Sequence, residues 1–445
     1  MSETTDIERG TDELVEQSGR AALRLANADE ATRNDALRSI ADALRENEAE
    51  ILDANARDVE AAEELLARGE YTQALVDRLK LDAAKLDDIA EMVESVAEQA
   101  DPLGRTLAAR ELDEGLELYR VSVPIGVVAT VFESRPDALV QIAALALKSG
   151  NAVILKGGSE ASESNRVLHR VIREATADLP DGWAGLVEAH EEVDRLLELD
   201  DEVDLVMPRG SSEFVSHIQS NTQIPVLGHT EGICHVYVDE AADLEMAADV
   251  AYDAKVQYPA VCNAVETLLV NESVAPDLLP DLVERYEAAG VELRGDAATR
   301  EFVDVGAATD DDWDTEYGDL ELSIKVVDDV YEAVDHVNAH GSKHTESIVT
   351  EDGGAARAFM TGIDAASVFH NASTRFADGY RYGLGAEVGI STGKVHARGP
   401  VGLEGLTTYK YYLEGDGHLV ASYSGEDALP YTHRELDAEW AFDDE

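Results

Sequence analysis

From Ile125 onward the chain alternates short, continuously apolar segments with amphipathic ones, and this alternation constrains the fold more than any other feature. The apolar runs at 126–132 and 152–156 have the length of buried strands, and residues 138–148 between them have that of a helix. A further strand is expected over 204–208, again with a helix after it. Buried strands that alternate with helices predict a parallel sheet covered on both faces, so we expect an α/β fold.

The polar residues that follow these strands are candidates for ligand binding, because open parallel sheets bind ligands at the carboxyl ends of their strands. Lys156 ends one strand and is followed by Gly157, while Gly210 and Ser211 follow another. A lysine beside glycine-led helix N-termini suits phosphate, through its charge and through backbone N–H groups. Two other glycine patterns, within 383–394, miss the spacings of a dinucleotide fingerprint and of a P-loop, so they predict nothing here.

Cys262, one of only two cysteines, lies where a predicted helix gives way to a predicted strand. Apolar residues at helical spacing lead up to Ala254, Pro259 then breaks the helix, and the apolar run 267–270 follows. On such a turn a thiol can face a cleft, where it is a candidate nucleophile. The alternative is that Cys262 is a small buried hydrophobe, which is the more frequent role of an isolated cysteine.

The regions before and after the first predicted sheet have other patterns. Residues 12–100 show helical periodicity, with apolar positions on one face of each predicted helix. The segment 111–123 alternates apolar and polar residues around Gly115, which predicts a β-hairpin. A late strand at 407–413 is expected to pair with this hairpin.

The stretch 369–398 is rich in glycines and hydroxyl side chains, and we expect it to be a loop. Many such loops have only a structural role. Arg375, Arg381 and Arg398 lie in it, although the chain as a whole is poor in cations. This concentration of arginines favours recognition of an anion.

Acidic residues dominate the composition, since 93 Asp and Glu stand against 35 Lys and Arg, for a net charge of −58. A strongly cationic partner is one explanation. Because the acids are spread along the whole chain, we favour the other, a solvated surface adapted to concentrated salt, where charge repulsion is screened. The same charge argues against binding nucleic acid.

Three observations bear on the compartment. There is no apolar run long enough to span a membrane, and the acidic N-terminus lacks the apolar core of a secretory signal. Cys234 and Cys262 form neither a metal-binding pair nor a disulfide framework. We therefore expect a cytoplasmic protein without membrane attachment.

Six segments, in the same order, resemble the γ-glutamyl phosphate reductase family, a branch of the aldehyde dehydrogenase superfamily, over roughly residues 12–420. They are VPIGVVATVFESRPD, LKSGNAVILKGGSEASESN, GHTEGICHVYVD, VCNAVETLLV, VNAHGSKHTESIVTED and NASTRFADGYRYGLGAEVGISTGKVHARGPVGLEGLTTYK. The ordered set is far more specific than any single segment.

The resemblance implies an aldehyde dehydrogenase-like fold, with two parallel-sheet domains and a small β arm that joins subunits. The expected boundaries are 1–109 and 124–233 for the nicotinamide cofactor-binding domain, 234–404 for the catalytic thiol domain, 110–123 and 405–421 for the oligomerisation arm, and 422–445 for an acidic C-terminal tail.

The resemblance also implies an activity, the NADPH-dependent reduction of L-glutamate 5-phosphate to L-glutamate 5-semialdehyde in proline biosynthesis. Cys262 would form a thioester as phosphate leaves, and an electropositive turn would help its thiol to ionise near pH 7. One competing hypothesis is another acyl-reducing or semialdehyde dehydrogenase of the same fold, and the arginine-bearing loop with the segment around Arg135 argues against it. The other is a superfamily member kept as a structural or binding protein, and the intact Cys262 with its neighbouring motif argues against that.

The resemblance assigns roles to residues by position, and it assigns no metal. Cys262 is the implied nucleophile. The implied cofactor-binding residues, for NADPH or NADP⁺, are Lys156, Gly157, Ser159, Gly210, Ser211 and Glu316. The implied substrate-binding residues are Arg135, Asn371, Ser373, Arg375 and Arg398. For Arg135 the alternative is a plain ion pair with Glu133 or Asp137.

Two departures from the wider superfamily bear on the chemistry. Hydrolytic aldehyde dehydrogenases place a general-base glutamate about where residues 228–230 read Gly-His-Thr here. They also place an oxyanion-hole asparagine in the stretch occupied here by 132–136. Loss of the base suits a reductase whose acyl-enzyme must not be hydrolysed. The backbone N–H of Cys262 is the expected first oxyanion donor, and the second is unidentified.

The implied partners are the small-molecule substrate and further copies of the chain, as a dimer or tetramer. The sequence leaves open an association with glutamate 5-kinase, the enzyme that makes the labile acyl phosphate. Nucleic acid and membrane partners are not expected.

Overall fold

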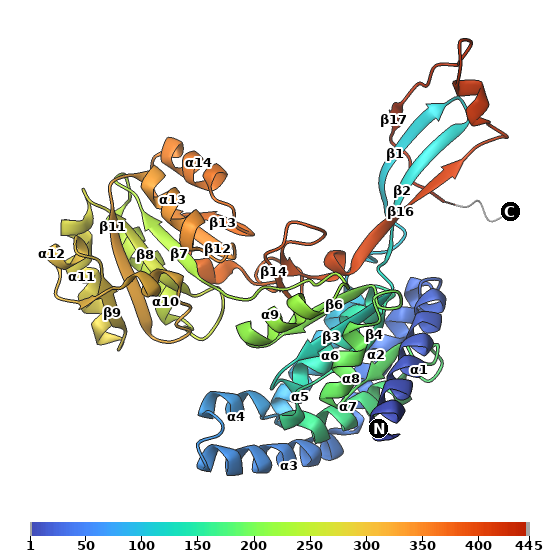
Figure 1. Cartoon of the computed structure of the whole chain (residues 1–445), viewed down its shortest axis with the longest axis horizontal. Coiled ribbons are helices and arrows are strands. Elements are labelled where there is room, and N and C mark those ends of the chain that lie inside the picture. Colours follow the sequence, from blue (N-terminus) through green and yellow to red (C-terminus); the bar gives the residue numbers. More distant parts are fainter. Residues whose placement is uncertain (1, 442–445) are drawn as a thin grey trace.

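The computed structural model describes residues 2–441 and divides into three bodies, as Figure 1 shows. We define the first domain by the four-stranded sheet of 127–209 with the helices of 2–98, and the second domain by the seven-stranded sheet of 234–370. The arm is a third, four-stranded sheet, which projects away from both domains (Figure 1). The α/β fold expected from the sequence is confirmed.

The N-terminal region is helical, as predicted. Leu37, Ile40 and Leu44 are fully buried against the first sheet's core, while the charged residues between them face outward. Asp29 begins the second helix, where its carboxylate accepts a hydrogen bond from the Thr32 N–H at 2.8 Å. The helices are α1 (Ser2–Leu25), α2 (Glu30–Glu46), α3 (Glu48–Ala67), α4 (Gln73–Leu79) and α5 (Ala83–Glu98).

The first sheet is parallel and has the strand order β5-β4-β3-β6. Its strands are β3 (Val127–Phe132), β4 (Ala152–Lys156), β5 (Ala184–Leu186) and β6 (Leu205–Arg209). The elements between and after them are α6 (Pro136–Lys148), η1 (Ser159–Ala161), α7 (Ser162–Ala175), α8 (His190–Leu197) and α9 (Ser212–Asn221). Every residue of β3 and β4 is buried, which explains their continuously apolar sequence.

The register of this sheet gathers three strand ends. Val131 of β3 lies opposite Lys156 of β4, and Phe132 lies opposite Arg209 of β6. The residues that follow all three strands therefore meet at one edge of the sheet. This is the edge at which the sequence predicted ligand binding.

The second sheet is also parallel, with the order β10-β9-β11-β8-β7-β12-β13. Its strands are β7 (Cys234–Val238), β8 (Val265–Asn271), β9 (Glu292–Gly295), β10 (Gly306–Ala307), β11 (Glu321–Val327), β12 (Thr345–Val349) and β13 (Ser367–His370). The elements around them are α10 (Leu244–Val256), α11 (Ala275–Ala288), α12 (Thr299–Phe302), η2 (Asp310–Asp314), α13 (Val330–His340) and α14 (Gly353–Gly362). Leu268 and Val270 pack into one core and Leu269 into another, so β8 is buried on both faces.

The arm confirms the predicted hairpin and its late partner strand. β1 (Thr106–Asp113) and β2 (Leu116–Pro124) turn at Gly115, whose φ of +73° favours glycine. β16 (Thr407–Glu414) pairs antiparallel with β2.

The segment 422–445, expected to be an acidic tail, contributes to the arm as well. β17 (Arg434–Leu436) pairs with β1 along the free edge of the hairpin. Trp440 then stacks on Tyr412, with 4.3 Å between ring centroids. Residues 442–445 of that segment lie outside the described residues.

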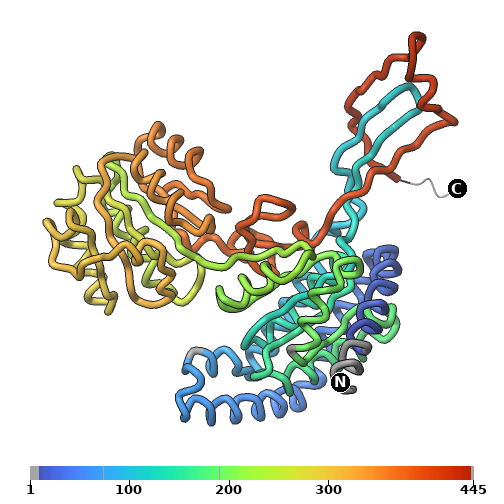
Figure 2. The backbone as a smooth tube through the Cα atoms, in the orientation of Figure 1, coloured from blue at the N-terminus to red at the C-terminus, as the bar shows by residue number. Residues whose placement is uncertain are grey.

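The predicted loop at 369–398 runs from the second domain back to the first (Figure 2). It contains η3 (Thr374–Phe376) and β14 (Gly389–Ser391), and it is followed by β15 (Gly399–Val401) and η4 (Leu403–Leu406). Ala386 and Val388 of this loop pack into the core of the first domain. No helix within residues 2–441 combines the length and the apolar character needed to cross a bilayer.

Candidate active site

A cleft of about 580 Å³ lies where the turn bearing Cys262 faces the carboxyl edge of the first sheet. Its lining comes from the ends of β3 and β6 with the residues that follow them, from the turn before β8, and from the region of α4. The polar lining residues include Glu133, Ser134, Arg135, Arg209 and Ser211, with Cys262 opposite them. The Cys262 side chain thus lines a cleft and is only partly buried, which favours the interpretation as a candidate nucleophile.

Local contacts fix the Cys262 turn. α10 ends at Val256, and the turn closes with a hydrogen bond from the Ala264 N–H to the Val261 carbonyl at 2.9 Å. The Asn263 side chain donates to the Ala377 carbonyl at 2.7 Å, which ties the turn to the interdomain loop. A Cβ at position 232 would collide with the Cys262 backbone, so Gly232 permits the close approach of the two segments.

The surroundings of the thiol do not favour its expected ionisation near pH 7. Burial first, and then the carboxylates of Glu316 and Glu387, together raise the pKa of Cys262 to about 12, while Arg209 acts in the opposite direction. Desolvation is the largest cause of this shift, so the thiol is neutral at pH 7. Arg209 and Arg375 lie within electrostatic reach of the thiol but do not offset its burial, so the expected ionisation near pH 7 is not supported.

Arg209 is a site residue that the sequence argument missed. It ends β6, lines the cleft, and its Nη1 is buried with no hydrogen-bond partner in the described part of the chain. Burial lowers its pKa, and the nearby charge of Arg135 acts in the same direction. The available signal was its place at a strand end, directly before the Gly210-Ser211 turn.

Arg135 is brought to the same cleft. It is the residue before α6, half of its side chain is exposed, and its Nε lies 4.0 Å from an Asp137 carboxylate oxygen. This long contact with Asp137 leaves most of the guanidinium free, and no ion pair with Glu133 is present among residues 2–441. The preceding Ser134 has φ of +48°, an uncommon backbone conformation for a serine.

Backbone N–H groups at this edge already hold carboxylates. The Ser211 N–H, at the start of α9, donates to Glu133 at 3.0 Å. The Ser134 N–H and hydroxyl donate to Glu160 at 2.6 and 2.8 Å. These donors therefore bind anions in the folded protein, which is the property that a diphosphate requires.

The other predicted cofactor residues come from the end of β4 with the turn after it, and from the segment before β11. Lys156 is buried and its Nζ donates to the Gly157 carbonyl at 2.8 Å. Burial lowers the pKa of Lys156, while the charges of Glu160 and Glu133 counteract that effect. Ser159 opens η1 directly after this turn. Glu316, from the segment before β11, is close enough to raise the pKa of Cys262.

The predicted substrate residues of the interdomain loop divide into two groups. Arg375 is buried, donates to the Gln257 side chain at 3.0 Å, and lies within electrostatic reach of Cys262. Asn371 and Ser373 shape the loop instead. The Asn371 amide bonds the Thr350 backbone N–H and carbonyl at 2.9 and 3.1 Å, and the Ser373 hydroxyl accepts from the Arg375 N–H.

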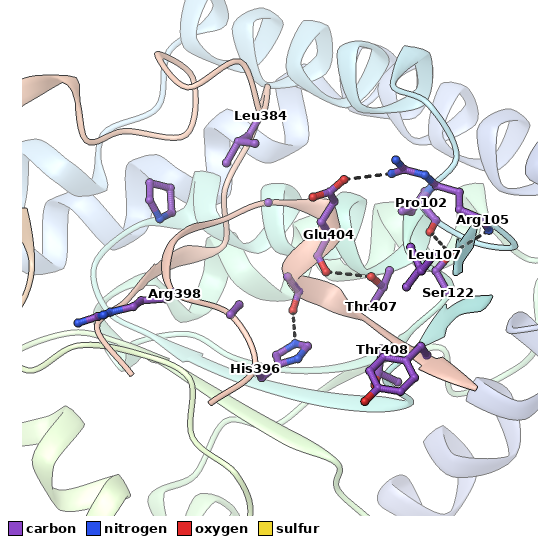
Figure 3. A pocket seen from close by; sticks show the side chains of 15 residues that line it. Pro102, Arg105, Leu107, Ser122, Leu384, His396, Arg398, Glu404, Thr407 and Thr408 are labelled. Carbon is purple, nitrogen blue, oxygen red and sulfur yellow. Dashed lines mark hydrogen bonds and ion pairs between the residues drawn. The ribbon is translucent and has the colours of Figure 1, made fainter. Parts of the chain in front are cut away.

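Arg398 lies apart from this cleft. Its guanidinium donates to Asp364 at 3.0 Å. It lines a different cavity, of about 460 Å³, at the base of the arm, where Figure 3 shows it with Arg105, His396 and Glu404. The structure thus brings Cys262 and Arg135 to one cleft and Arg375 within electrostatic reach of the thiol, but it leaves Arg398 in another place.

His229 occupies the stretch where a hydrolytic enzyme would have its general base. It lines a smaller cavity of about 150 Å³ together with Cys262 and Glu387. Its Nδ1 lies 3.0 Å from the Ile390 carbonyl oxygen. Burial lowers the pKa of His229, so the ring is neutral at pH 7.

Comparisons with known proteins agree with this geometry. The model of the aldehyde dehydrogenase family matches residues 4–316. The chain is 71% identical over 443 residues to a γ-glutamyl phosphate reductase of Natronomonas pharaonis, covering 99% of this chain and 100% of the relative. It is 64% identical to that of Haloquadratum walsbyi, covering 99% and 98% of the two chains. Both relatives come from halophilic organisms, in accord with the acidic composition.

Solved structures give the same result for the fold. The crystal structure of γ-glutamyl phosphate reductase from Thermotoga maritima is 44% identical, with a TM-score of 0.89, and covers 92% of this chain and 99% of its own. A betaine aldehyde dehydrogenase from Staphylococcus aureus, at 17% identity and a TM-score of 0.63, covers 94% of this chain and 90% of its own. The latter similarity concerns the fold alone.

Proposed function

The chain belongs to the aldehyde dehydrogenase family and, within it, to the γ-glutamyl phosphate reductases, and from this premise we propose a specific reaction and mechanism. The enzyme reduces γ-glutamyl phosphate to glutamate 5-semialdehyde with NADPH and releases phosphate, by way of a thioester on Cys262. The observation that carries the proposal is the cleft in which the Cys262 turn faces the strand ends bearing Arg135 and Arg209.

The covalent step uses Cys262 as the nucleophile. Its sulfur attacks the acyl carbon, the carbon–oxygen bond to the phosphate breaks, and inorganic phosphate leaves. Arg209 and Arg135 attract the phosphate group, and the buried Nη1 of Arg209 has an unused donor for it. The thiol must first lose its proton, and Arg209 is a cation that lowers its pKa.

The thioester needs a hydride to become an aldehyde, and the nicotinamide supplies that hydride when it is bound. Lys156, Gly157 and Ser159, after β4, would hold the adenosine side of the cofactor. Gly210 and Ser211 would hold the diphosphate, since the Ser211 N–H holds a carboxylate in the free protein. Glu316 is the proposed partner of the nicotinamide ribose. The charge of Lys156 supports a 2′-phosphate, and hence NADPH over NADH.

The interdomain loop is the proposed binding site for the glutamyl portion. Arg375 has the right charge for the substrate's α-carboxylate and lies within electrostatic reach of the thiol. Asn371 and Ser373 position the loop through their backbone contacts. Arg398 is paired with Asp364 outside the cleft, so it would have to leave this ion pair to contact the substrate.

The assembly is also a proposal. The arm exposes Tyr411 and Leu413 on β16, at the edge of its sheet, and these side chains suit burial against a second copy of the chain. We infer a homo-oligomer joined through this arm. An association with glutamate 5-kinase would protect the labile acyl phosphate during its transfer.

The experiment that tests the reaction is a coupled assay in molar KCl. Glutamate, ATP and a γ-glutamyl kinase generate the acyl phosphate, and the oxidation of NADPH is followed. The proposal predicts oxidation that requires all three components, with no comparable rate from other acyl phosphates. Oxidation that is equally fast with acetyl phosphate would overturn the assignment of the substrate.

A further inference from the structure

Two histidines from different segments lie beside the Cys262 thiol. One ring nitrogen of His229, one of His344 and the Cys262 sulfur all lie within 4.8 Å of one another. His229 belongs to the connection between the two domains, and His344 directly precedes β12. The two imidazole rings meet edge to face, with 5.1 Å between their centroids. Three groups that can bind a metal ion therefore converge from three parts of the chain.

The nitrogen of His229 that is free to bind a metal is Nε2. Its Nδ1 faces the Ile390 carbonyl oxygen, which can only accept a hydrogen bond, so Nδ1 carries the proton. A histidine whose other N–H is held by a backbone carbonyl has the arrangement typical of a metal ligand. The cavity of about 150 Å³ that His229 and Cys262 line leaves space for a further ligand such as water.

His344 presents an unused nitrogen in a buried place. Only 1% of its surface is exposed, yet its Nε2 has no hydrogen-bond partner within residues 2–441. Its Nδ1 lies 2.8 Å from the Thr345 hydroxyl and 3.8 Å from the Cys234 sulfur. A buried polar atom without a partner is costly, so its retention needs a reason.

We propose that Cys262, His229 and His344 form a binding site for a Zn²⁺-like transition-metal ion, which takes the thiol out of the reaction while it is bound. Two imidazole nitrogens and one sulfur are a ligand set that suits Zn²⁺, and the set has no oxygen ligand for Mg²⁺ or Ca²⁺. Tetrahedral zinc keeps neighbouring ligand atoms about 3.3–3.7 Å apart, so the three atoms must close by about 1.5 Å at most. Rotations of the side chains supply such a movement.

The binding step is balanced by proton release. The metal ion binds the thiolate, so the Cys262 proton is released as the sulfur–metal bond forms. Both histidines are neutral, because burial lowers the pKa of His229 and lowers that of His344 to about 3, and they therefore need not lose a proton. A sulfur bound to metal cannot attack an acyl phosphate, so the metal inhibits. This inhibition rests on the proposed role of Cys262, whereas the binding site itself does not.

The test measures metal binding directly on the full chain in molar KCl. Zn²⁺ is titrated in competition with a chromogenic chelator, and Co²⁺ is used as a spectroscopic probe for a thiolate-to-metal charge-transfer band. We expect one tight ion per chain and a band. His229→Ala and His344→Ala should each weaken Zn²⁺ binding at least about tenfold, and Cys262→Ser should remove the band. His344→Gln, which is closer in size, covers the case in which the alanine variant does not fold.

Two control variants separate this site from other sources of binding. His217→Ala, on the exposed face of α9, should leave the affinity unchanged, whereas the many surface acids would bind metal weakly in every variant. Cys234→Ser should keep the band. An affinity that does not depend on His229 or His344, or a band that persists in Cys262→Ser, would overturn the proposal.

The same measurements distinguish failure of the metal site from failure of the proposed function. If Cys262 is essential for NADPH oxidation but no tight Zn²⁺ site is found, only the metal proposal fails. If Zn²⁺ binds as expected while Cys262→Ser still turns over, the proposed mechanism fails and the site remains.

Discussion

The two cysteines lie side by side, yet the segments that hold them give them opposite properties. Cys234 is in β7, fully buried, and its sulfur donates to the Cys262 carbonyl oxygen at 3.2 Å. Cys262 lies on the turn before β8, partly exposed, on a cleft that also contains Arg209 and Arg135. The same thiol group is therefore a packing group in the strand and a candidate nucleophile on the turn. The difference lies in the segment, and each prediction below tests it.

The largest expected effect is the loss of turnover on removal of the Cys262 thiol, which lines the cleft. Cys262→Ala should reduce NADPH oxidation by about four orders of magnitude or more, because the covalent step disappears, while cofactor binding survives. Cys234→Ala should keep most of the activity and cost about 1 kcal/mol in the free energy of unfolding. Steady-state kinetics and denaturant titration measure both. Near-normal turnover by Cys262→Ala would remove the distinction between the two cysteines.

The next effect tests Arg209, the cation that lies near Cys262 in the cleft. Arg209→Ala should lower kcat/KM by about 10²–10³, because the variant loses attraction for the phosphate and raises the pKa of Cys262 further. The rate at which iodoacetamide alkylates Cys262 should fall as well. Arg209→Lys, which keeps the charge, should restore part of both. If alkylation stays at the wild-type rate in Arg209→Ala, the guanidinium does not act on the thiol.

A smaller effect is expected from the cofactor side of the cleft. Lys156→Ala should erode the preference for NADPH over NADH by about tenfold, since it removes a charge that attracts a 2′-phosphate. Alkylation of Cys262 should continue at close to the wild-type rate, which separates cofactor choice from thiol reactivity. The measurement is kcat/KM with each cofactor. Equal efficiency with NADPH and NADH in the unmodified enzyme would contradict the assignment.

The smallest expected effect is the pH dependence of alkylation at Cys262 compared with Cys234. With a pKa of about 12, the ligand-free Cys262 thiol should be alkylated about tenfold faster for each pH unit between pH 7 and 10. The unfolded thiol ionises near 9.0, so this group favours unfolding progressively as pH rises from 9 towards 12, and has no such effect below that range. Cys234, whose pKa burial also raises, should resist the reagent until the chain unfolds. A rate plateau near pH 7 would show an ionised Cys262.

The sequence predicted the main elements because their signals are local. The strands β3, β4 and β8 each contain a short run of apolar residues, and Pro259 marked the turn before Cys262. The predicted strand at 407–413 was also expected to pair with the hairpin, and it does so as β16 against β2. Even the placement of Lys156 at a ligand-binding edge needed only the rule for parallel strand ends.

The rest of the site depends on contacts between segments far apart in the chain. Glu133 reaches the Ser211 N–H across two strand ends, and Glu316 and Glu387 reach the thiol from separate loops. No local pattern predicts such convergence, so the sequence did not show that burial and two carboxylates raise the pKa of Cys262. β17 was missed for a related reason, since Arg434–Leu436 is too short to show a strand period and forms only against β1.

The most direct test of the central claim runs the reaction backwards in phosphate-free buffer with glutamate 5-semialdehyde and NADP⁺. The resemblance implies that Gly228-His229-Thr230 lies where hydrolytic aldehyde dehydrogenases have a general-base glutamate. Burial keeps His229 neutral and its Nδ1 faces a carbonyl, so we predict that water does not release the acyl group. At most one NADPH should form per chain, with a glutamyl adduct on the peptide of Cys262, and added phosphate or arsenate should restore steady turnover. Sustained NADPH formation without phosphate, or an adduct on Cys234, would contradict the account.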